Sequence, residues 1–221
     1  MGKLESDLME RAPAKPIFWK RFIDDIFFIW TKGEERLREF MEFINLFHNT
    51  IKFTFNWSSE QVSFLDVNVV LRNGIVSTDL YSKPTDKHQY LFHTSCHPNP
   101  CNSSSFGQAL RIRRICTTNA FFEKRARELC NYLVQRGYSK DHVKRKIDRA
   151  RRIPRADTLR DKQPANSNRI PFVVTFHPAL PNIGEILHRL HPVLKSSRRC
   201  QSAIKQVPMV ALRGLKVLRT F

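Results

Sequence analysis

Residues 17–30, with the sequence Ile-Phe-Trp-Lys-Arg-Phe-Ile-Asp-Asp-Ile-Phe-Phe-Ile-Trp, decide the fold of the amino-terminal half. Two aromatic and β-branched runs are interrupted only by Asp24 and Asp25. Because such runs favour strands and Asp favours turns, the stretch predicts a β-hairpin with two carboxylates at its tip.

A helix is predicted directly after this hairpin. Residues 31–34, Thr-Lys-Gly-Glu, have the capping-box pattern that begins a helix, and Asn49 is placed to end it. Apolar residues recur between them at helical spacing: Leu37, Phe40, Met41, Ile44 and Phe47. The pattern predicts one amphipathic helix.

Strand signals continue after the helix. Alternating apolar residues predict a strand over residues 51–57. The pair Asn73-Gly74 predicts a tight turn between strands over residues 62–71 and 75–81. The order hairpin, helix, strand, hairpin predicts an α+β arrangement with a helix on a sheet.

Three helices are predicted in the next segment, over residues 106–116, 120–136 and 140–152. Asn119 and Ser139 are placed as N-caps, and Gly137 is placed as a left-handed helix stop. The second and third helices each have one apolar face: Phe122, Ala126, Leu129 and Leu133, then Val143, Ile147 and Ala150. The fold class is therefore α+β, with a basic three-helix bundle after the sheet-containing half.

The charge is distributed unevenly along the chain. The 221 residues carry a formal net charge of +18, but residues 1–110 contribute −1, residues 111–155 contribute +11 and residues 156–221 contribute +8. Clustered Lys and Arg release counterions when they neutralise a polyanion, so a nucleic acid is the expected partner.

Cysteine usage and hydropathy indicate the compartment. The five cysteines are odd in number, and no charged start leads into an apolar signal core. No stretch approaches the roughly 20 apolar residues that span a bilayer. We expect an intracellular, nuclear protein with free thiols and no membrane partner.

Two groups of residues have metal-binding chemistry. Asp24 and Asp25 at a hairpin tip could hold Mg²⁺ for phosphoryl transfer, although an exposed Asp-Asp turn is also a sufficient structural explanation. A second group resembles a zinc spacing, but it fits no standard finger and contains two prolines: His93, Cys96, His97 and Cys101.

Several motifs resemble one family in their order. The string Phe22-Ile23-Asp24-Asp25 resembles the aromatic-x-Asp-Asp box of reverse transcriptases, and residues 21–35 are similar to Penelope-like retroelement enzymes. Further similar strings are residues 63–67, 73–86, 96–98, 108–116 and 136–138. The resemblance extends over most of residues 2–190.

The resemblance implies a partial palm, a thumb and a connector of an RNA-directed DNA polymerase. It makes Asp24 the principal Mg²⁺ ligand, Asp25 its neighbour, and the hairpin over residues 64–81 a primer grip. Lys52 matches a possible proton donor to pyrophosphate, although a solvated strand lysine is the simpler interpretation.

The sequence also departs from this family. The fingers and a further catalytic Asp, which normally precede the Asp-Asp hairpin, are not found, and no Gly-Ile-Tyr or Tyr-Ile-Gly nuclease string occurs. Loss of one carboxylate from a group that acts as a unit costs several orders of magnitude in rate. We therefore expect no independent polymerase activity unless a complementing polymerase segment supplies the missing part, and no DNA cleavage.

The basic helices have two interpretations, which share one chemistry. The short connection over residues 136–139 before a very basic helix is typical of a helix-turn-helix, whereas the family resemblance makes the same helices a thumb that follows an RNA/DNA duplex. The predicted nucleic-acid-binding residues are Arg111, Arg113, Arg114, Lys124, Arg125, Lys144, Arg145, Lys146 and Arg149.

The domain division follows from these patterns. We predict a partial palm over residues 1–85, a helical domain over 86–155, and a linker and connector over 156–221. In the last segment, residues 170–176 predict a strand, and residues 184–190 predict a short helix that leads to His191-Pro192.

Overall fold

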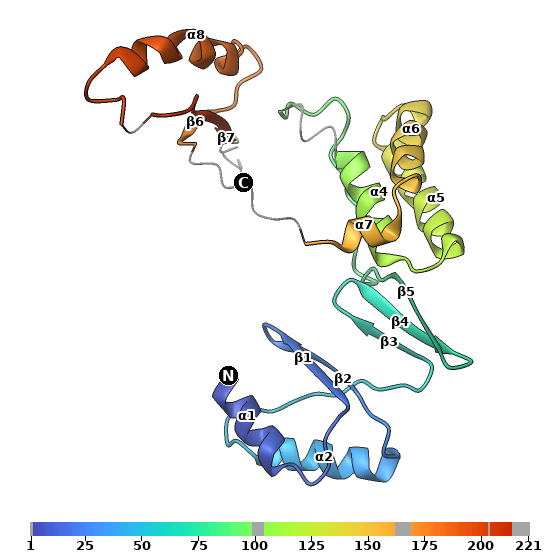
Figure 1. Cartoon of the computed structure of the whole chain (residues 1–221). Coiled ribbons are helices and arrows are strands. Elements are labelled where there is room, and N and C mark those ends of the chain that lie inside the picture. Colours follow the sequence, from blue (N-terminus) through green and yellow to red (C-terminus); the bar gives the residue numbers. More distant parts are fainter. Residues whose placement is uncertain (1, 99–103, 162–168, 203, 214–221) are drawn as a thin grey trace, which may run out of the picture. The chain divides into compact units, whose positions relative to one another are not determined.

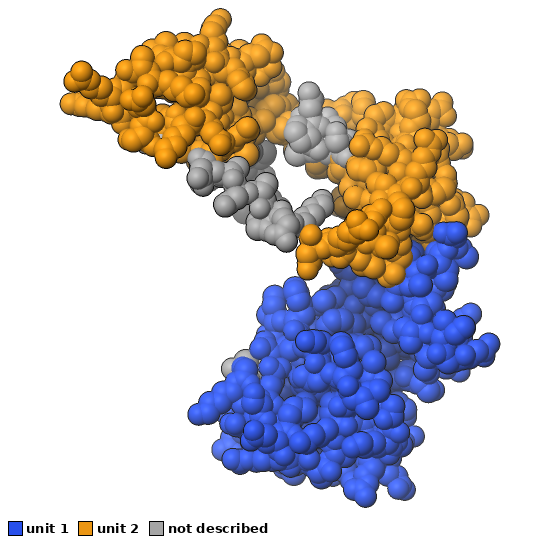
Figure 2. Space-filling model, viewed as in Figure 1, with its two compact units in different colours: residues 1–85, 115–121 blue, residues 86–114, 122–221 orange. Residues whose placement is uncertain are grey.

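The computed structural model describes residues 2–98, 104–161, 169–202 and 204–213. The described chain is a mixed α+β protein, which confirms the predicted class at that level. It divides into two compact units, residues 1–85 with 115–121 and residues 86–114 with 122–221 (Figure 2). The predicted boundary at residue 155 between a helical domain and a connector stays a prediction.

The first unit begins with α1 (Gly2–Arg11), β1 (Phe18–Phe22), β2 (Asp25–Ile29) and α2 (Glu34–Leu46). The predicted hairpin is confirmed, because Phe22 pairs with Asp25 across a two-residue turn. An aromatic core joins the hairpin to α2: the buried Phe40 ring contacts Trp19, Phe28 and Trp30 at centroid distances of 6.3, 6.1 and 5.2 Å. Burial of one Phe in a core stabilises a protein by about 3–5 kcal/mol relative to Ala, so this cluster makes a large contribution to the stability of the first unit.

The boundaries of α2 differ from the prediction. The N-cap is Gly33 at φ +82°, and no side chain caps the helix, so the predicted Thr31 capping box does not form. The helix ends at Leu46, before Asn49. The Lys52 ammonium donates to the Asn45 and His48 carbonyls at the end of α2, at 2.5 and 3.3 Å, which is a structural role.

The strand predicted over residues 51–57 is wrong. This segment joins no sheet, although its alternation persists as partial burial of Ile51, Phe53 and Phe55. The Asn45 side chain replaces a neighbouring strand: its carbonyl accepts from the Phe53 backbone N–H at 2.7 Å, and its amide donates to the Phe53 carbonyl at 3.1 Å. The alternating apolar side chains of this segment are thus buried by packing on α2 and not by pairing in a sheet.

A three-stranded antiparallel sheet completes the first unit, with β3 (Gln61–Phe64), β4 (Val67–Arg72) and β5 (Ile75–Leu80) in that order. The predicted turn at Asn73-Gly74 is confirmed, with φ of +50° and +74°. The single strand predicted over residues 62–71 is in fact two strands, because the chain reverses at Leu65-Asp66. Leu65 adopts φ +53°, a conformation that its sequence does not signal.

The second unit contains most of α4 (Ser104–Ile115) and of α5 (Asn119–Gln135), together with α6 (Lys140–Arg151) and the short α7 (Arg155–Leu159). The helices α4, α5 and α6 lie side by side (Figure 1). Their predicted bounds are confirmed to within two residues. The predicted apolar faces of α5 and α6 are buried, Leu133 and Val143 completely. The caps differ in detail: the Thr118 hydroxyl accepts from the Phe121 N–H, and Ser139 occupies the N-cap position without a side-chain bond.

The turn between α5 and α6 closes as predicted at Gly137, which adopts φ +83°. The Gly137 N–H donates to the Val134 carbonyl at 3.0 Å, and the Tyr138 N–H donates to the Leu133 carbonyl at 3.2 Å. This bond pair is the Schellman motif, and the residues at its two ends, Leu133 and Tyr138, are both buried.

The carboxyl-terminal segment is a β-α-β unit of β6 (Pro171–Thr175), α8 (Ile183–Ser196) and β7 (Met209–Arg213). The two strands pair in parallel, with Phe172 opposite Val210. The predicted strand is confirmed, but α8 continues through Pro192 instead of ending before it, and β7 was not predicted.

Gly137 provides a test of the turn. Replacement of Gly137 by Ala forces a Cβ-bearing residue into the left-handed region, which costs about 1–2 kcal/mol. The space around it is open, because a Cβ there would lie no closer than 3.9 Å to another side-chain atom. We expect a lower denaturant midpoint when helix content is followed by circular dichroism.

Gly107 in the interior of α4 is the matched control, because a Cβ there meets nothing within 4 Å and its φ is not positive. Gly107→Ala should raise the midpoint, since Ala is favoured over Gly in a helix by about 0.5–1 kcal/mol. Equal effects of the two substitutions would contradict the role of Gly137.

Candidate nucleic-acid interface

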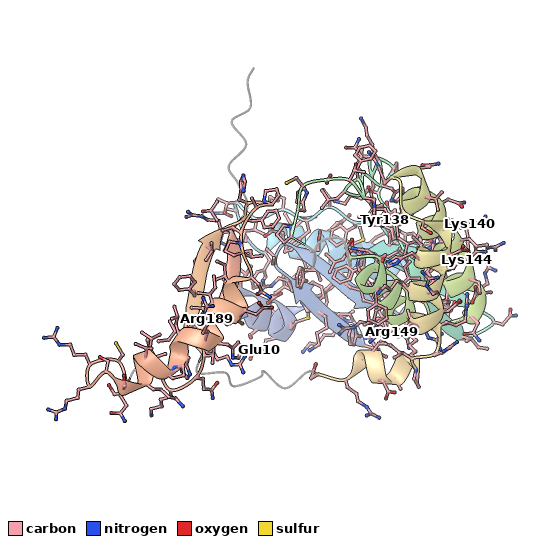
Figure 3. The ribbon with its side chains drawn as sticks, turned by 90° about the horizontal axis from the view of Figure 1, so that it is seen from above. Glu10, Tyr138, Lys140, Lys144, Arg149 and Arg189 are labelled. Carbon is pink, nitrogen blue, oxygen red and sulfur yellow. The ribbon has the colours of Figure 1, made fainter. Side chains whose placement is uncertain are left out.

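The helix α6 has the strongest positive charge of the described helices. Its twelve residues contain six Lys or Arg and two Asp, a net charge of +4. Val143, Ile147 and Ala150 face the bundle core, so the charged side chains occupy the remaining sides. In Figure 3, Tyr138, Lys140 and Lys144 lie toward one end of the bundle and Arg149 toward the other.

Two arginines of α6 are held by its neighbours. On the side of α4, the Arg149 guanidinium lies over the Phe106 ring, 4.5 Å from its centroid. On the side of α5, Arg151 pairs with Glu123 through two bonds of 2.7 and 2.9 Å. The hydrogen bonds that Arg151 donates to Glu123 raise the pKa of Arg151, against the smaller opposing effect of burial. These contacts link α6 to α4 and to α5.

Lys144, Arg145 and Lys146 do not share one side of the helix. Consecutive helical residues are about 100° apart, so these three side chains span more than half of the circumference. Lys144 and Arg145 are exposed, whereas Lys146 is partly buried. The structure therefore presents two of the three side chains fully to a large partner.

The predicted nucleic-acid-binding residues of α4 and α5 also fall into two groups, one bound within the bundle and one exposed. Arg113 donates to the Ile153 carbonyl at 3.1 Å and lies over the Phe122 ring at 5.5 Å, and Arg125 pairs with Glu128 at 2.9 Å. Both are thus used within the bundle. Three further predicted residues are exposed: Arg111, Arg114 and Lys124.

The two candidate metal ligands lie at the hairpin tip, as the sequence predicts. Asp24 is in the turn and Asp25 begins β2, and both are exposed. Ile23 precedes them at φ +53°, where a β-branched residue is strained, and its carbonyl accepts from Arg21 at 3.0 Å. Within the described ranges, no group of three or more His, Cys, Asp or Glu residues is arranged to hold a metal ion. The hairpin thus supplies two carboxylates and no complete two-metal site.

The four residues with zinc-like spacing are only partly described, because Cys101 lies outside the described residues. The His93 ring packs edge-to-face on Tyr138, with centroids 5.1 Å apart. Cys96 is a free, exposed thiol.

An aromatic segment that precedes α4 was not predicted from the sequence. The His88 ring stacks on Tyr132 of α5 with centroids 4.3 Å apart, and Tyr90 stacks on the same ring at 6.5 Å. The only signal was the density of ring residues over 88–93, His-Gln-Tyr-Leu-Phe-His. Burial raises the pKa of Tyr90, Asp86 adds to that effect, and Arg111 opposes it.

Comparison with known proteins gives one result that agrees with this geometry. The sequence model of a family described as the animal helix-turn-helix domain matches residues 89–148. The match includes α4, α5, the Gly137 turn and most of α6. No curated protein and no solved structure matches the chain. The class defined by this part of the chain is therefore a helix-turn-helix-like bundle.

None of the helices in the described ranges combines the length and the apolarity that a bilayer span requires.

The raised pKa of Tyr90 predicts alkaline sensitivity of the bundle. The unfolded chain releases the phenol proton near its ordinary pKa of 10.0, whereas the folded chain retains it to higher pH. The contribution of Tyr90 is thus present below pH 10 and is lost as the pH rises through its raised pKa. Tyr90→Phe should reduce the fall in denaturant midpoint between neutral and alkaline pH. The same fall in both proteins would contradict the assignment, and Tyr81→Phe, at a tyrosine in the first unit, is the control.

Proposed function

We propose that the helix-turn-helix-like bundle binds a nucleic-acid duplex, with α6 as the helix that meets it. The match of residues 89–148 to the animal helix-turn-helix domain carries the proposal. Its support from geometry is the reversal at Gly137, which joins α5 to the basic α6 by a four-residue connection. In this class of motif the second helix lies in the major groove.

The side chains of α6 suit contact with phosphates. Lys140, Lys144 and Arg145 are exposed and carry long, flexible cationic side chains near the amino-terminal end of α6. Such residues contact phosphate oxygens, which position the protein without reading the sequence. Asp141, beside them, is negative and disfavours close contact with a phosphate. The proposed binding is therefore dominated by charge and shape, and it weakens steeply with salt.

The salt dependence of binding gives the number of phosphate contacts that α6 makes. Replacing Lys144 and Arg145 together by Ala should flatten the slope of log affinity against log salt by about 2 units, because each lost phosphate contact removes about 0.9. Adding Lys146→Ala should change the slope less than either of the other two, because Lys146 is partly buried.

Arg189→Ala with Lys195→Ala is the control for this measurement. Both residues are exposed on α8, and replacing them removes the same formal charge as the α6 double variant. An unchanged slope in the α6 variant, or an equal change in the α8 variant, would reject α6 as the contact.

A second candidate function is a piece of a retroelement RNA-directed DNA polymerase, with the first unit as part of its palm and the bundle as its thumb. The observation that favours it is the strained hairpin, in which Ile23 at φ +53° places Asp24 in the turn beside Asp25. The described residues do not fit a complete Mg²⁺ site, because only two carboxylates meet there. This candidate therefore requires a further carboxylate from a complementing segment.

Primer extension on an RNA template tests whether the chain is a polymerase by itself. The chain, with Mg²⁺ or Mn²⁺, should bind the template–primer and add no nucleotides, because the ligand set is incomplete. Incorporation that disappears in the Asp24→Asn, Asp25→Asn double variant would contradict this expectation and establish the polymerase function. The double variant should bind duplex as the unaltered chain does.

A further inference from the structure

A short segment before α4 is attached along the carboxyl-terminal part of α5. His88 and Tyr90 turn their rings toward Tyr132, and the His93 backbone N–H donates to the Arg136 carbonyl at 2.9 Å. The Asp86 carboxylate accepts from the His88 backbone N–H at 2.8 Å. The segment is thus held at several points along its length.

Phe92 is more exposed than the packed rings of His88 and Tyr90 in the same segment. Its residue surface is 52% exposed, whereas His88 and Tyr90 are partly buried. The Arg136 guanidinium lies over the ring, 4.7 Å from the centroid. The Ser95 N–H also donates to the Phe92 carbonyl at 3.0 Å, so the backbone here is fixed by a turn. An aromatic ring is therefore held in place, next to a cation, with much of its surface open to solvent.

This ring lies beside the turn that leads into α6. Arg136 is the residue before Gly137, and the His93 ring contacts Tyr138 on the other side of that turn. The Cβ of His93 is the closest side-chain atom to the position that a Cβ on Gly137 would occupy, at 3.9 Å. Lys140 begins α6 only four residues after Arg136. The aromatic ring and the amino-terminal end of α6 thus both lie next to this turn.

We propose that Phe92, backed by Arg136, is a stacking site for an unpaired nucleobase at the end of a duplex that α6 holds. Aromatic rings stack on every base, and a nearby guanidinium adds a cation–π contribution and attracts the phosphate backbone. The ring is already fixed, so little conformational entropy is lost on binding. The proposal rests on the proposed binding of a duplex by the bundle, and it adds a preference for duplexes that carry a single-stranded end.

Duplex probes with and without an overhang test the site. The full chain is titrated with a blunt DNA duplex, with the same duplex carrying a short unpaired DNA overhang, and with an RNA overhang. The first unpaired position holds 2-aminopurine, whose fluorescence is quenched when it stacks. We expect tighter binding to an overhang duplex than to the blunt one. The DNA and RNA arms show which backbone the site accepts.

Variants of Phe92 assign the gain to its ring. Phe92→Ala should lower the affinity for the overhang duplex by roughly 5- to 150-fold and should leave the affinity for the blunt duplex unchanged. It should also abolish the quenching. Phe92→Trp should retain both effects, because it keeps a stacking surface, whereas Phe92→Leu should lose them although it keeps apolar bulk.

Phe172→Ala is the matched control, since Phe172 is 46% exposed in β6 and lies outside the bundle. No gain from an overhang, or a gain and quenching that persist in Phe92→Ala, would overturn the stacking site while the duplex-binding function stands. Failure of the unaltered chain to bind any duplex would instead overturn the proposed function, and the stacking site with it.

Discussion

The bundle depends on one backbone constraint, the left-handed conformation of Gly137. At φ +83° the chain leaves α5 and enters α6 within four residues, and two hydrogen bonds close the end of α5. The same reversal buries Tyr138 against the bundle and places His93 beside the turn. Both proposed contacts with nucleic acid, α6 and Phe92, therefore lie next to a turn whose geometry only a residue without a Cβ adopts at low cost.

The cations of the bundle have two different roles. Arg113 and Arg151 lie on the buried ring of Phe122, at 5.5 and 6.0 Å, and Arg151 is further held by Glu123. Because these side chains join one helix to another, their guanidinium groups already have partners within the bundle. Lys144 and Arg145 are exposed and have the opposite role. The net charge of +11 over residues 111–155 therefore overstates the charge that a polyanion meets.

The first unit contains two hairpin turns of the same kind. Ile23 and Leu65 each adopt φ +53°, and each is followed by an Asp. Neither residue favours this region, so the conformation is maintained by the strands on either side and by packing such as the Phe27–Phe64 contact at 5.5 Å. Strain is thus concentrated at the two tips that bear carboxylates, which the second candidate function would use at Asp24 and Asp25.

The sequence by itself determined the helices of the bundle, their buried faces, the Asn73-Gly74 turn and the Asp-Asp hairpin, because periodicity and turn residues act over short distances. Only the tertiary structure decided the rest. The replacement of a strand at Phe53 depends on the side chain of Asn45, and the reversal at Leu65 depends on packing such as the Phe27–Phe64 contact, neither of which a local pattern shows. The arginines that bind within the bundle and the exposed Phe92 were likewise invisible in composition, since a residue type does not say which face its neighbours leave open to solvent.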